Sequence, residues 1–145
     1  MYCYNLSMSN NNTPFAAFVI CYASGMPAGS LCATTRAADR GESGQIGLPG
    51  GKIDFGEDPA AAALREAAEE GWKLPSDTVL TEAHRSLVDG HMIVWLKADK
   101  KAVRMVCFKE RGRIRPIVSD MEAMSKSGFG NDWMEPELYQ FDVGE

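Results

Sequence analysis

One stretch of the sequence constrains the fold more than any other: Gly51–Trp72, which reads GKIDFGEDPAAAALREAAEEGW. Asp58 is suited to cap the start of a helix, and Pro59 stands at the first helical position, where proline is tolerated best. The alanine-rich run that follows is made of strong helix formers, and Gly71 provides a C-terminal stop. We therefore predict a helix over Pro59–Glu70, about three turns long.

One side of this predicted helix is acidic and the other is apolar. At about 100° per residue, three glutamates fall within an arc of about 100°: Glu66, Glu69 and Glu70. The opposite side carries three apolar residues: Ala61, Leu64 and Ala68. The pattern predicts that the apolar side packs on a sheet while the carboxylates face a cleft.

Acidic residues outnumber basic ones in this stretch, so a bound positive charge would stabilise it. Asp54, Glu57, Asp58 and the three helix glutamates face only Lys52 and Arg65. Like charges three or four residues apart destabilise a helix by a few tenths of a kcal/mol. A divalent cation would relieve this repulsion, and clustered oxygen ligands suit Mg²⁺ or Mn²⁺. Arg65 lies four residues before Glu69 and is placed to hydrogen-bond that carboxylate and hold it as a ligand. The alternative is an ordinary solvated acidic face.

The residue order in this stretch resembles the signature of the Nudix hydrolases. That signature is Gly, five residues, Glu, seven residues, Arg-Glu, an aliphatic residue, any residue and Glu-Glu, with Gly and an aliphatic residue at its end. Six positions match in register: Gly51, Glu57, Arg65, Glu66, Glu69 and Glu70. The run Leu48–Gly51 is also typical of the family. The resemblance implies an α/β Nudix fold, an α/β/α sandwich with a mixed central sheet.

The match departs from the family pattern at its end. The final glycine and aliphatic positions hold Trp72 and Lys73, and Gly71 comes one place early. Every carboxylate precedes this irregularity. We therefore expect a helix that ends one residue sooner, with the metal site intact.

The resemblance also implies roles for individual residues. The implied metal ligands are Glu66, Glu69, Glu70 and a backbone carbonyl at Gly51 or its neighbour Gly50. The implied catalytic group is Glu57, Arg65, Glu66 and Glu69. Within it, Glu69 is a ligand or the water-orienting base, and Arg65 and Glu57 support the ligands. The base varies in this family, so Glu110 is a candidate outside the signature, with an exposed surface glutamate as the alternative.

Strands are predicted on both sides of the helix. They are Phe15–Tyr22, Leu31–Arg36, Gln45–Leu48, Leu80–Val88, His91–Ala98, Val103–Lys109 and Ile114–Val118. The first two are expected to form a hairpin, and Asp89-Gly90 is the strongest hairpin signal in the chain. Pro116 confines the last strand to a sheet edge. A short helix is expected over Asp120–Ser127, followed by a loop over Gly128–Trp133.

Length and charge limit the domain count and the partners. The 145 residues suit one domain, which we place at residues 14–145 behind a flexible lead-in at 1–13. The net charge of −5 makes a long nucleic acid an improbable partner. No apolar run approaches the roughly 20 residues of a transmembrane helix, and the first residues lack a signal-peptide pattern. We expect no membrane association.

The four cysteines are widely spaced, which argues against a zinc site: Cys3, Cys21, Cys32 and Cys107. Cys21 and Cys32 lie in apolar strand patterns and are expected to be core thiols. A cytoplasmic location, in a reducing compartment, fits this usage of cysteine.

The sequence does not decide which aromatic and basic residues outside the signature contact a ligand. Trp95 is expected in the core because its strand is apolar, and Trp133 either packs or contacts a ligand. His84 and His91 are expected to be plain surface residues. Arg36 or Arg40 either reaches a substrate phosphate or is solvated.

The resulting hypothesis is a metal-dependent pyrophosphohydrolase that cleaves a nucleoside diphosphate linked to another moiety X. A nucleotide sugar, a dinucleotide and a nucleoside triphosphate are all open as substrates. Leu87, Val88 and Asp89 occupy the window where some subfamilies carry a proline or tyrosine marker, so neither marker is present. The alternatives are a catalytically silent nucleotide-binding module and an unrelated acidic-helix domain. A homodimer is compatible with the resemblance.

Overall fold

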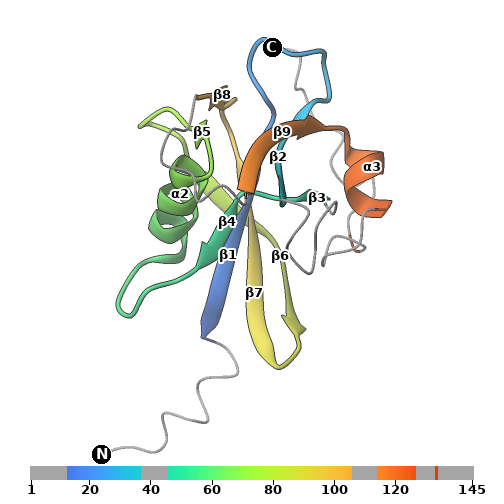
Figure 1. The fold of residues 1–145 in the computed structure, drawn as a ribbon. Coiled ribbons are helices and arrows are strands. Elements are labelled where there is room, and N and C mark those ends of the chain that lie inside the picture. Colours follow the sequence, from blue (N-terminus) through green and yellow to red (C-terminus); the bar gives the residue numbers. More distant parts are fainter. Residues whose placement is uncertain (1–12, 37–45, 106–113, 127–132, 134–145) are drawn as a thin grey trace, which may run out of the picture.

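The computed structural model describes residues 13–36, 46–105, 114–126 and 133, and it has a mixed sheet between two helices (Figure 1). The strands are β1 (Pro14–Ile20), β2 (Leu31–Arg36), β3 (Ile46–Gly47), β4 (Gly50–Lys52), β5 (Trp72–Lys73), β6 (Leu80–Val88), β7 (His91–Ala98), β8 (Val103–Arg104) and β9 (Ile114–Ser119). The helices are α2 (Pro59–Glu69) and α3 (Met121–Lys126). Neither of these two helices is long and apolar enough to span a membrane.

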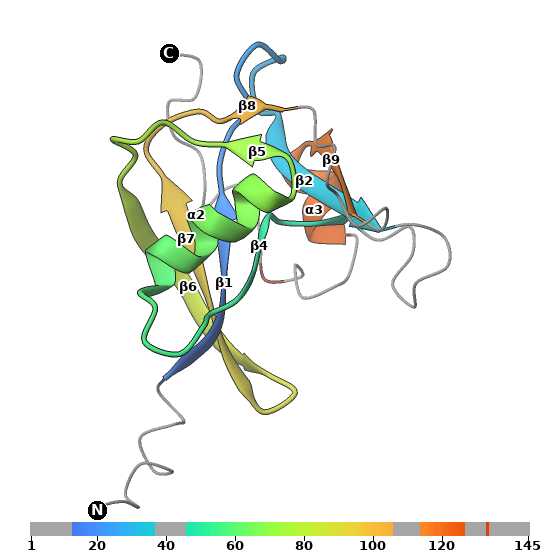
Figure 2. The same cartoon turned by 60° about the vertical axis from the view of Figure 1, so that its left-hand side comes forward.

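The strands form three hydrogen-bonded groups. Four strands make the central sheet in the order β4-β1-β7-β6, three follow the order β3-β2-β9, and β5 pairs with β8. The sheet is mixed because β1 runs parallel to β7 and antiparallel to β4. The helix α2 lies across one face of the central sheet, and α3 lies on the other side beside β9 (Figure 2). The predicted sandwich of a mixed sheet between helices is confirmed.

The two middle strands of the central sheet, β1 and β7, are buried on both faces, so their side chains alternate between two cores. Ala17 and Val19 of β1 pack toward α2, together with Val94 and Leu96 of β7. Their neighbours along each strand point into a second core that contains α3: Ala16, Ile20, Ile93, Trp95, Met121 and Met124. A sheet covered on both faces needs apolar residues at successive positions, which explains the unbroken apolar run in β1.

The predicted hairpin between the first two strands is wrong. The strand β1 lies between β4 and β7, whereas β2 lies between β3 and β9. Beyond those pairings, the two segments approach through a bridge between Tyr22 and Leu31, where the Cys32 N–H donates to the Cys21 carbonyl at 2.8 Å. Both edges of β1 are occupied by other strands, so the chain must leave the central sheet before it forms β2.

Other local predictions are confirmed. Asp89 and Gly90 have φ of 51° and 84° and join β6 to β7, and two positive φ angles are the mark of a type I′ hairpin turn. Pro116 lies in β9, which ends its group of strands. Trp95, Cys21 and Cys32 are buried. The predicted strand over Val103–Lys109 is present as β8, and its part after residue 105 lies outside the described residues.

The two ends of α2 follow the sequence signals. The Asp58 carboxylate accepts from the backbone N–H groups of Ala60 and Ala61, at 3.0 and 3.3 Å. Pro59 occupies the first helical position. Gly71 has φ of 103°, in the left-handed region where glycine is favoured after a helix. Near the other helix, Asp120 accepts from the Ala123 N–H at 2.7 Å.

Asp58→Ala is expected to lower the free energy of unfolding by about 1 kcal/mol, because two N–H groups at the start of α2 lose their acceptor. Urea denaturation measures this change. The matched control is Asp58→Asn, which keeps a side-chain oxygen and should cost only a few tenths of a kcal/mol. Equal stability of the alanine variant and the wild type would show that the cap does not hold the helix.

Candidate active site

The helix α2 turns Glu66 and the adjoining Glu70 toward the sheet, whereas Glu69 is exposed. The buried residues of α2 are Ala62, Ala63 and Ala67. The predicted apolar side of Ala61, Leu64 and Ala68 is therefore wrong, since Ala61 and Ala68 are exposed. At about 100° per residue, Glu66 and Glu70 project between Ala62 and Ala67, on the inner side. Small alanines on that side leave room for the two carboxylates against the sheet.

Two glycines of β4 receive these carboxylates. A Cβ at Gly51 would lie 2.7 Å from both Cδ and Oε1 of Glu66. The Gly50 N–H donates to Oε1 of Glu70 at 3.1 Å. Gly50 itself has φ of 146°, and a Cβ there would clash with the backbone of Ala17 and Phe18. The Gly-Gly pair thus allows α2, β4 and β1 to approach one another closely.

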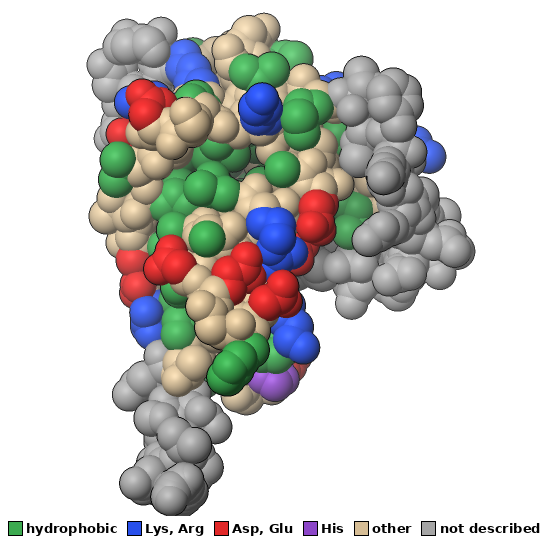
Figure 3. All heavy atoms as spheres, turned by 90° about the vertical axis from the view of Figure 1, so that its left-hand side faces the viewer, with side chains coloured by type: hydrophobic (Ala, Val, Ile, Leu, Met, Phe, Trp, Pro, Cys, Tyr) green, Lys and Arg blue, Asp and Glu red, His purple; other side chains and the backbone are tan. Residues whose placement is uncertain are grey.

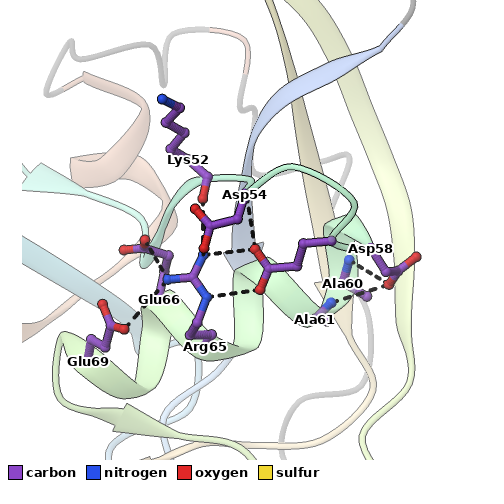
Figure 4. A network of polar contacts seen from close by, with 9 residues as sticks. Lys52, Asp54, Asp58, Ala60, Ala61, Arg65, Glu66 and Glu69 are labelled. Carbon is purple, nitrogen blue, oxygen red and sulfur yellow. Dashed lines mark hydrogen bonds and ion pairs between the residues drawn. The ribbon is translucent and has the colours of Figure 1, made fainter.

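Arg65 ties the acidic side chains together (Figure 4). Its Nε and Nη2 donate to the two oxygens of Glu57, each at 2.9 Å. Its Nη1 donates to Oε2 of Glu66 at 3.0 Å, and Nη2 also reaches the Lys52 carbonyl at 3.2 Å. The predicted partner Glu69 lies farther away, with 3.5 Å between Nη1 and Oε2. The planar guanidinium therefore fixes the loop before α2 to the helix, because it matches Glu57 at two points.

The surroundings shift the pKa values of the two carboxyls that Arg65 contacts in opposite directions. The hydrogen bonds from Arg65 lower the pKa of Glu57 to about 2. Burial raises the pKa of Glu66, and the nearby Glu69 adds to this effect, while Arg65 works against it. The pKa of Arg65 is raised by its hydrogen bonds to Glu57. Burial thus disfavours the charged form of Glu66, and the hydrogen bond from Arg65 favours it.

The same network gathers acidic groups on the molecular surface that α2 covers. Figure 3 shows Asp and Glu side chains around basic ones on this face. Asp54 contributes, with its Oδ2 3.5 Å from Arg65 Nη2. The sequence showed the charge of Asp54 but indicated no role for it. Its place three residues before Glu57, in the loop that leads to α2, was the available signal.

The remaining candidate residues either lie outside the described residues or make their contacts elsewhere in the fold. Glu110 and Arg40 lie outside the described residues, as does the side chain of Arg36. Trp133 packs, with its ring 4.1 Å from the His84 ring and 5.1 Å from that of Trp95. The expectation for His84 is wrong, because the strand pairing places it opposite Trp95, where its ring is half-buried between tryptophans. His91 is exposed as expected and stacks on Phe15.

The Glu57–Arg65 contact predicts a pH dependence of stability. A carboxyl with a folded-state pKa of about 2, against an ordinary value of 4.5, stabilises the fold above about pH 4.5 and loses this effect as the pH falls toward 2. Glu57→Gln should therefore be less stable than the wild type at pH 7, with a difference that shrinks below pH 4.5. Urea unfolding at stepped pH measures it. A difference that stays constant with pH would contradict the ion-pair explanation.

Comparison with known proteins places this arrangement in context. The family model described as NUDIX domain matches residues 13–139. The chain is 38% identical over 63 residues to the 8-oxo-dGTP diphosphatase of Escherichia coli (strain K12). These 63 residues are 43% of this chain and 49% of that protein. The chain thus spans about half the length of the curated relative that it matches.

Solved structures resemble the fold at low sequence identity. A structure from work on MutT of Aliivibrio salmonicida and Vibrio cholerae has a TM-score of 0.57 and 18% identity, and covers 87% of this chain and 94% of that one. An Ap4A hydrolase of C. elegans, solved as a binary complex, has a TM-score of 0.57 and 15% identity. The match covers 81% of this chain and 86% of that one. These likenesses show a shared fold.

Proposed function

Because the chain belongs to the Nudix hydrolase family, whose domain model spans residues 13–139, we propose that it is a metal-dependent pyrophosphohydrolase acting on a nucleotide. The bond cleaved joins two phosphates of a nucleoside diphosphate linked to a further group X. One observation supports the proposal most directly: Glu66 and Glu70 are directed from α2 onto the two glycines of β4, Gly50 and Gly51, and Arg65 fixes the loop beside them.

The donor atoms of this site fit a hard divalent cation. Carboxylate and peptide carbonyl oxygens are the ligands that Mg²⁺ and Mn²⁺ prefer. Among the described residues, no three acidic, histidine or cysteine side chains converge as a ready-made metal cage. Arg65 and the Gly50 N–H hold one oxygen each of Glu66 and Glu70. We therefore assign the metal to Glu66 and Glu70 with Glu69 and the carbonyl of Gly51 as further ligands, and with Mg²⁺ or Mn²⁺ as the ion.

A bound divalent ion would supply neutralisation of phosphate charge and a more acidic water. The residues of the chain then have separate tasks. Glu66 and Glu70 provide charge at a fixed place, because the glycines of β4 and Arg65 restrict their side chains. Glu69 is 55% exposed, so its carboxylate reaches solvent, and we assign it as a ligand or as the base that orients the attacking water. Arg65 and Glu57 act as positioning residues.

The names of the similar proteins support a nucleotide substrate, but each refers to a different nucleotide. Their names refer to 8-oxo-dGTP, Ap4A and UDP-X, respectively. We place a nucleoside triphosphate first, because the relative with the higher identity acts on 8-oxo-dGTP. A nucleotide sugar and a dinucleotide follow. We also expect a reducing, cytoplasmic location, since Cys21 and Cys32 are buried thiols.

The experiment that tests this proposal is release of nucleoside monophosphate from a panel of substrates. The panel contains nucleoside triphosphates, including 8-oxo-dGTP, together with ADP-ribose, FAD, NADH and diadenosine polyphosphates. Each is assayed with Mg²⁺, with Mn²⁺ and with a chelator. Metal-dependent cleavage of one compound would support the proposal and identify X. Nucleotide binding in calorimetry without any product would overturn it in favour of a catalytically silent binding module.

A further inference from the structure

Two buried thiols stand opposite each other in the core beneath α2, and the proposed hydrolysis uses neither. Tyr22 and Leu31 form an antiparallel bridge. One position further along each segment, Cys21 and Cys32 face each other, and the Cys32 N–H donates to the Cys21 carbonyl at 2.8 Å. Residues directly opposite each other in antiparallel segments point to the same side and have Cα atoms about 4.5–5.5 Å apart.

This placement satisfies the backbone geometry of a disulfide. A disulfide joins Cα atoms about 4.4–6.8 Å apart, with both Cβ atoms pointing into a common space. Cys21 and Cys32 belong to one core cluster and are at most 1% exposed. Their thiols also interact, because a hydrogen bond with the Cys21 side chain, followed by burial, raises the pKa of Cys32. The fold thus holds two sulfur atoms together within the reach of a covalent bond.

The turn after β7 controls access to this pair. A thiol reacts as its thiolate, which the closed core disfavours at Cys32. The Cys21 Sγ donates to the backbone carbonyl of Lys100 at 3.1 Å, so this turn covers the Cys21 thiol. Asp99 and Lys100 are exposed, and an exposed connection opens at a lower free energy than the core. Opening of the turn would therefore uncover Cys21.

We propose that Cys21 and Cys32 are a redox-sensitive pair, which glutathione disulfide converts into an intramolecular disulfide that locks the segment after β1 to β2. When the turn opens, the Cys21 thiolate attacks one sulfur of glutathione disulfide, and the glutathione that leaves takes up the proton that Cys21 lost. The Cys32 thiolate then displaces the second glutathione from the mixed disulfide, and that glutathione takes up the second proton. Two electrons pass from the cysteines to the glutathione pair.

The disulfide and the folded state would stabilise each other. The bond closes the connection between Cys21 and Cys32 and so restricts the unfolded chain. Because the folded state already holds the two sulfurs together, it favours the bond by the same factor by which the bond favours folding. The pair stays reduced while thiols dominate its surroundings, and the bond forms as the share of glutathione disulfide rises.

The thiol–disulfide equilibrium tests the proposal without any substrate. A chain with Cys3→Ser and Cys107→Ser leaves only the proposed pair to react. It is equilibrated with reduced and oxidised glutathione, once folded and once in urea above its unfolding transition. Alkylation and mass spectrometry give the oxidised fraction, and peptide mapping identifies the link between Cys21 and Cys32. We expect an equilibrium constant for the disulfide at least about ten-fold higher in the folded protein.

A matched control moves one thiol to the other side of the sheet. Cys32→Ala/Ala33→Cys keeps two thiols and lengthens the loop between them by one residue, so the unfolded chain should close it about as readily as before. Ala33 lies in the second core, which contains α3, whereas Cys21 lies in the core beneath α2. The folded control should therefore show no preference for the disulfide. Circular dichroism confirms that it is folded.

Three results would overturn the proposal. Equal equilibrium constants in the folded and the unfolded chain would show that the fold does not favour the bond. A lower constant in the folded protein would show that the core excludes it. An equal gain in the control variant would show that the placement of Cys21 opposite Cys32 is not the cause.

Discussion

Glu66→Gln and Glu70→Gln are each expected to lower metal-dependent turnover about 100- to 1,000-fold, the usual effect of removing one group that stabilises developing charge. Both side chains are directed at Gly50 and Gly51 of β4, where the glycines allow close approach. Glutamine keeps the size of the side chain and one oxygen acceptor. The loss should therefore come from the missing charge and not from altered packing.

Stability should move little in the same two variants. Burial raises the pKa of Glu66, so removing its charge also removes an unfavourable interaction, and we expect unfolding free energies within about 1 kcal/mol of the wild type. A loss of activity without a loss of stability is typical of residues kept for function. Single-turnover kinetics with Mg²⁺ or Mn²⁺ and urea denaturation measure the two effects.

A matched control distinguishes loss of a site carboxylate from loss of a surface carboxylate elsewhere. Glu122→Gln makes the same substitution on α3, where the carboxylate is exposed and bonds Lys126, and it should leave turnover unchanged. Glu69→Gln distinguishes the two roles of Glu69. A base gives a loss of kcat with an altered pH profile, whereas a ligand gives a loss that higher metal concentration partly reverses. Full activity in both Glu69→Gln and Glu70→Gln would refute the proposed site.

Trp72→Ala is expected to have the largest effect on stability, about 3–5 kcal/mol, the range for removing a buried tryptophan. Trp72 occupies the position of the last glycine in the family signature, and its side chain is 1% exposed within the core beneath α2. Its indole N–H donates to the Ala33 carbonyl at 2.9 Å. The residue therefore links the segment after α2 to β2 by packing and by one buried hydrogen bond.

Two further variants separate the contributions of packing and of the hydrogen bond to this loss of stability. Trp72→Phe keeps much of the apolar contact but leaves the Ala33 carbonyl without this donor, so we expect a cost of about 1–3 kcal/mol. Phe55→Ala removes an aromatic ring that is fully exposed in the loop before α2, and should stay within about 0.5 kcal/mol of the wild type. Urea denaturation ranks all three. If Trp72→Ala were as mild as Phe55→Ala, the irregular end of the signature would have no structural role.

The helix α2, its caps and the β6–β7 hairpin were predictable because each depends on neighbours along the chain. Asp58 bonds N–H groups two and three residues away. Asp89 and Gly90 adopt positive φ angles that few other residue pairs tolerate. The candidate site residues were also accessible from the sequence, because their spacing matches a family signature.

Only the tertiary structure decided which contacts these residues make. A helical period gives the angles between side chains but not the side that meets the sheet, and α2 buries Ala62, Ala63 and Ala67 beside its glutamates. Arg65 binds Glu57, eight residues away across a loop, more closely than Glu69 on its own helix. The parallel pairing of β1 with β7 joins segments more than 70 residues apart in the sequence. The sequence by itself determined the elements and the chemistry of their side chains, whereas their partners depended on packing between distant segments, which no local pattern specifies.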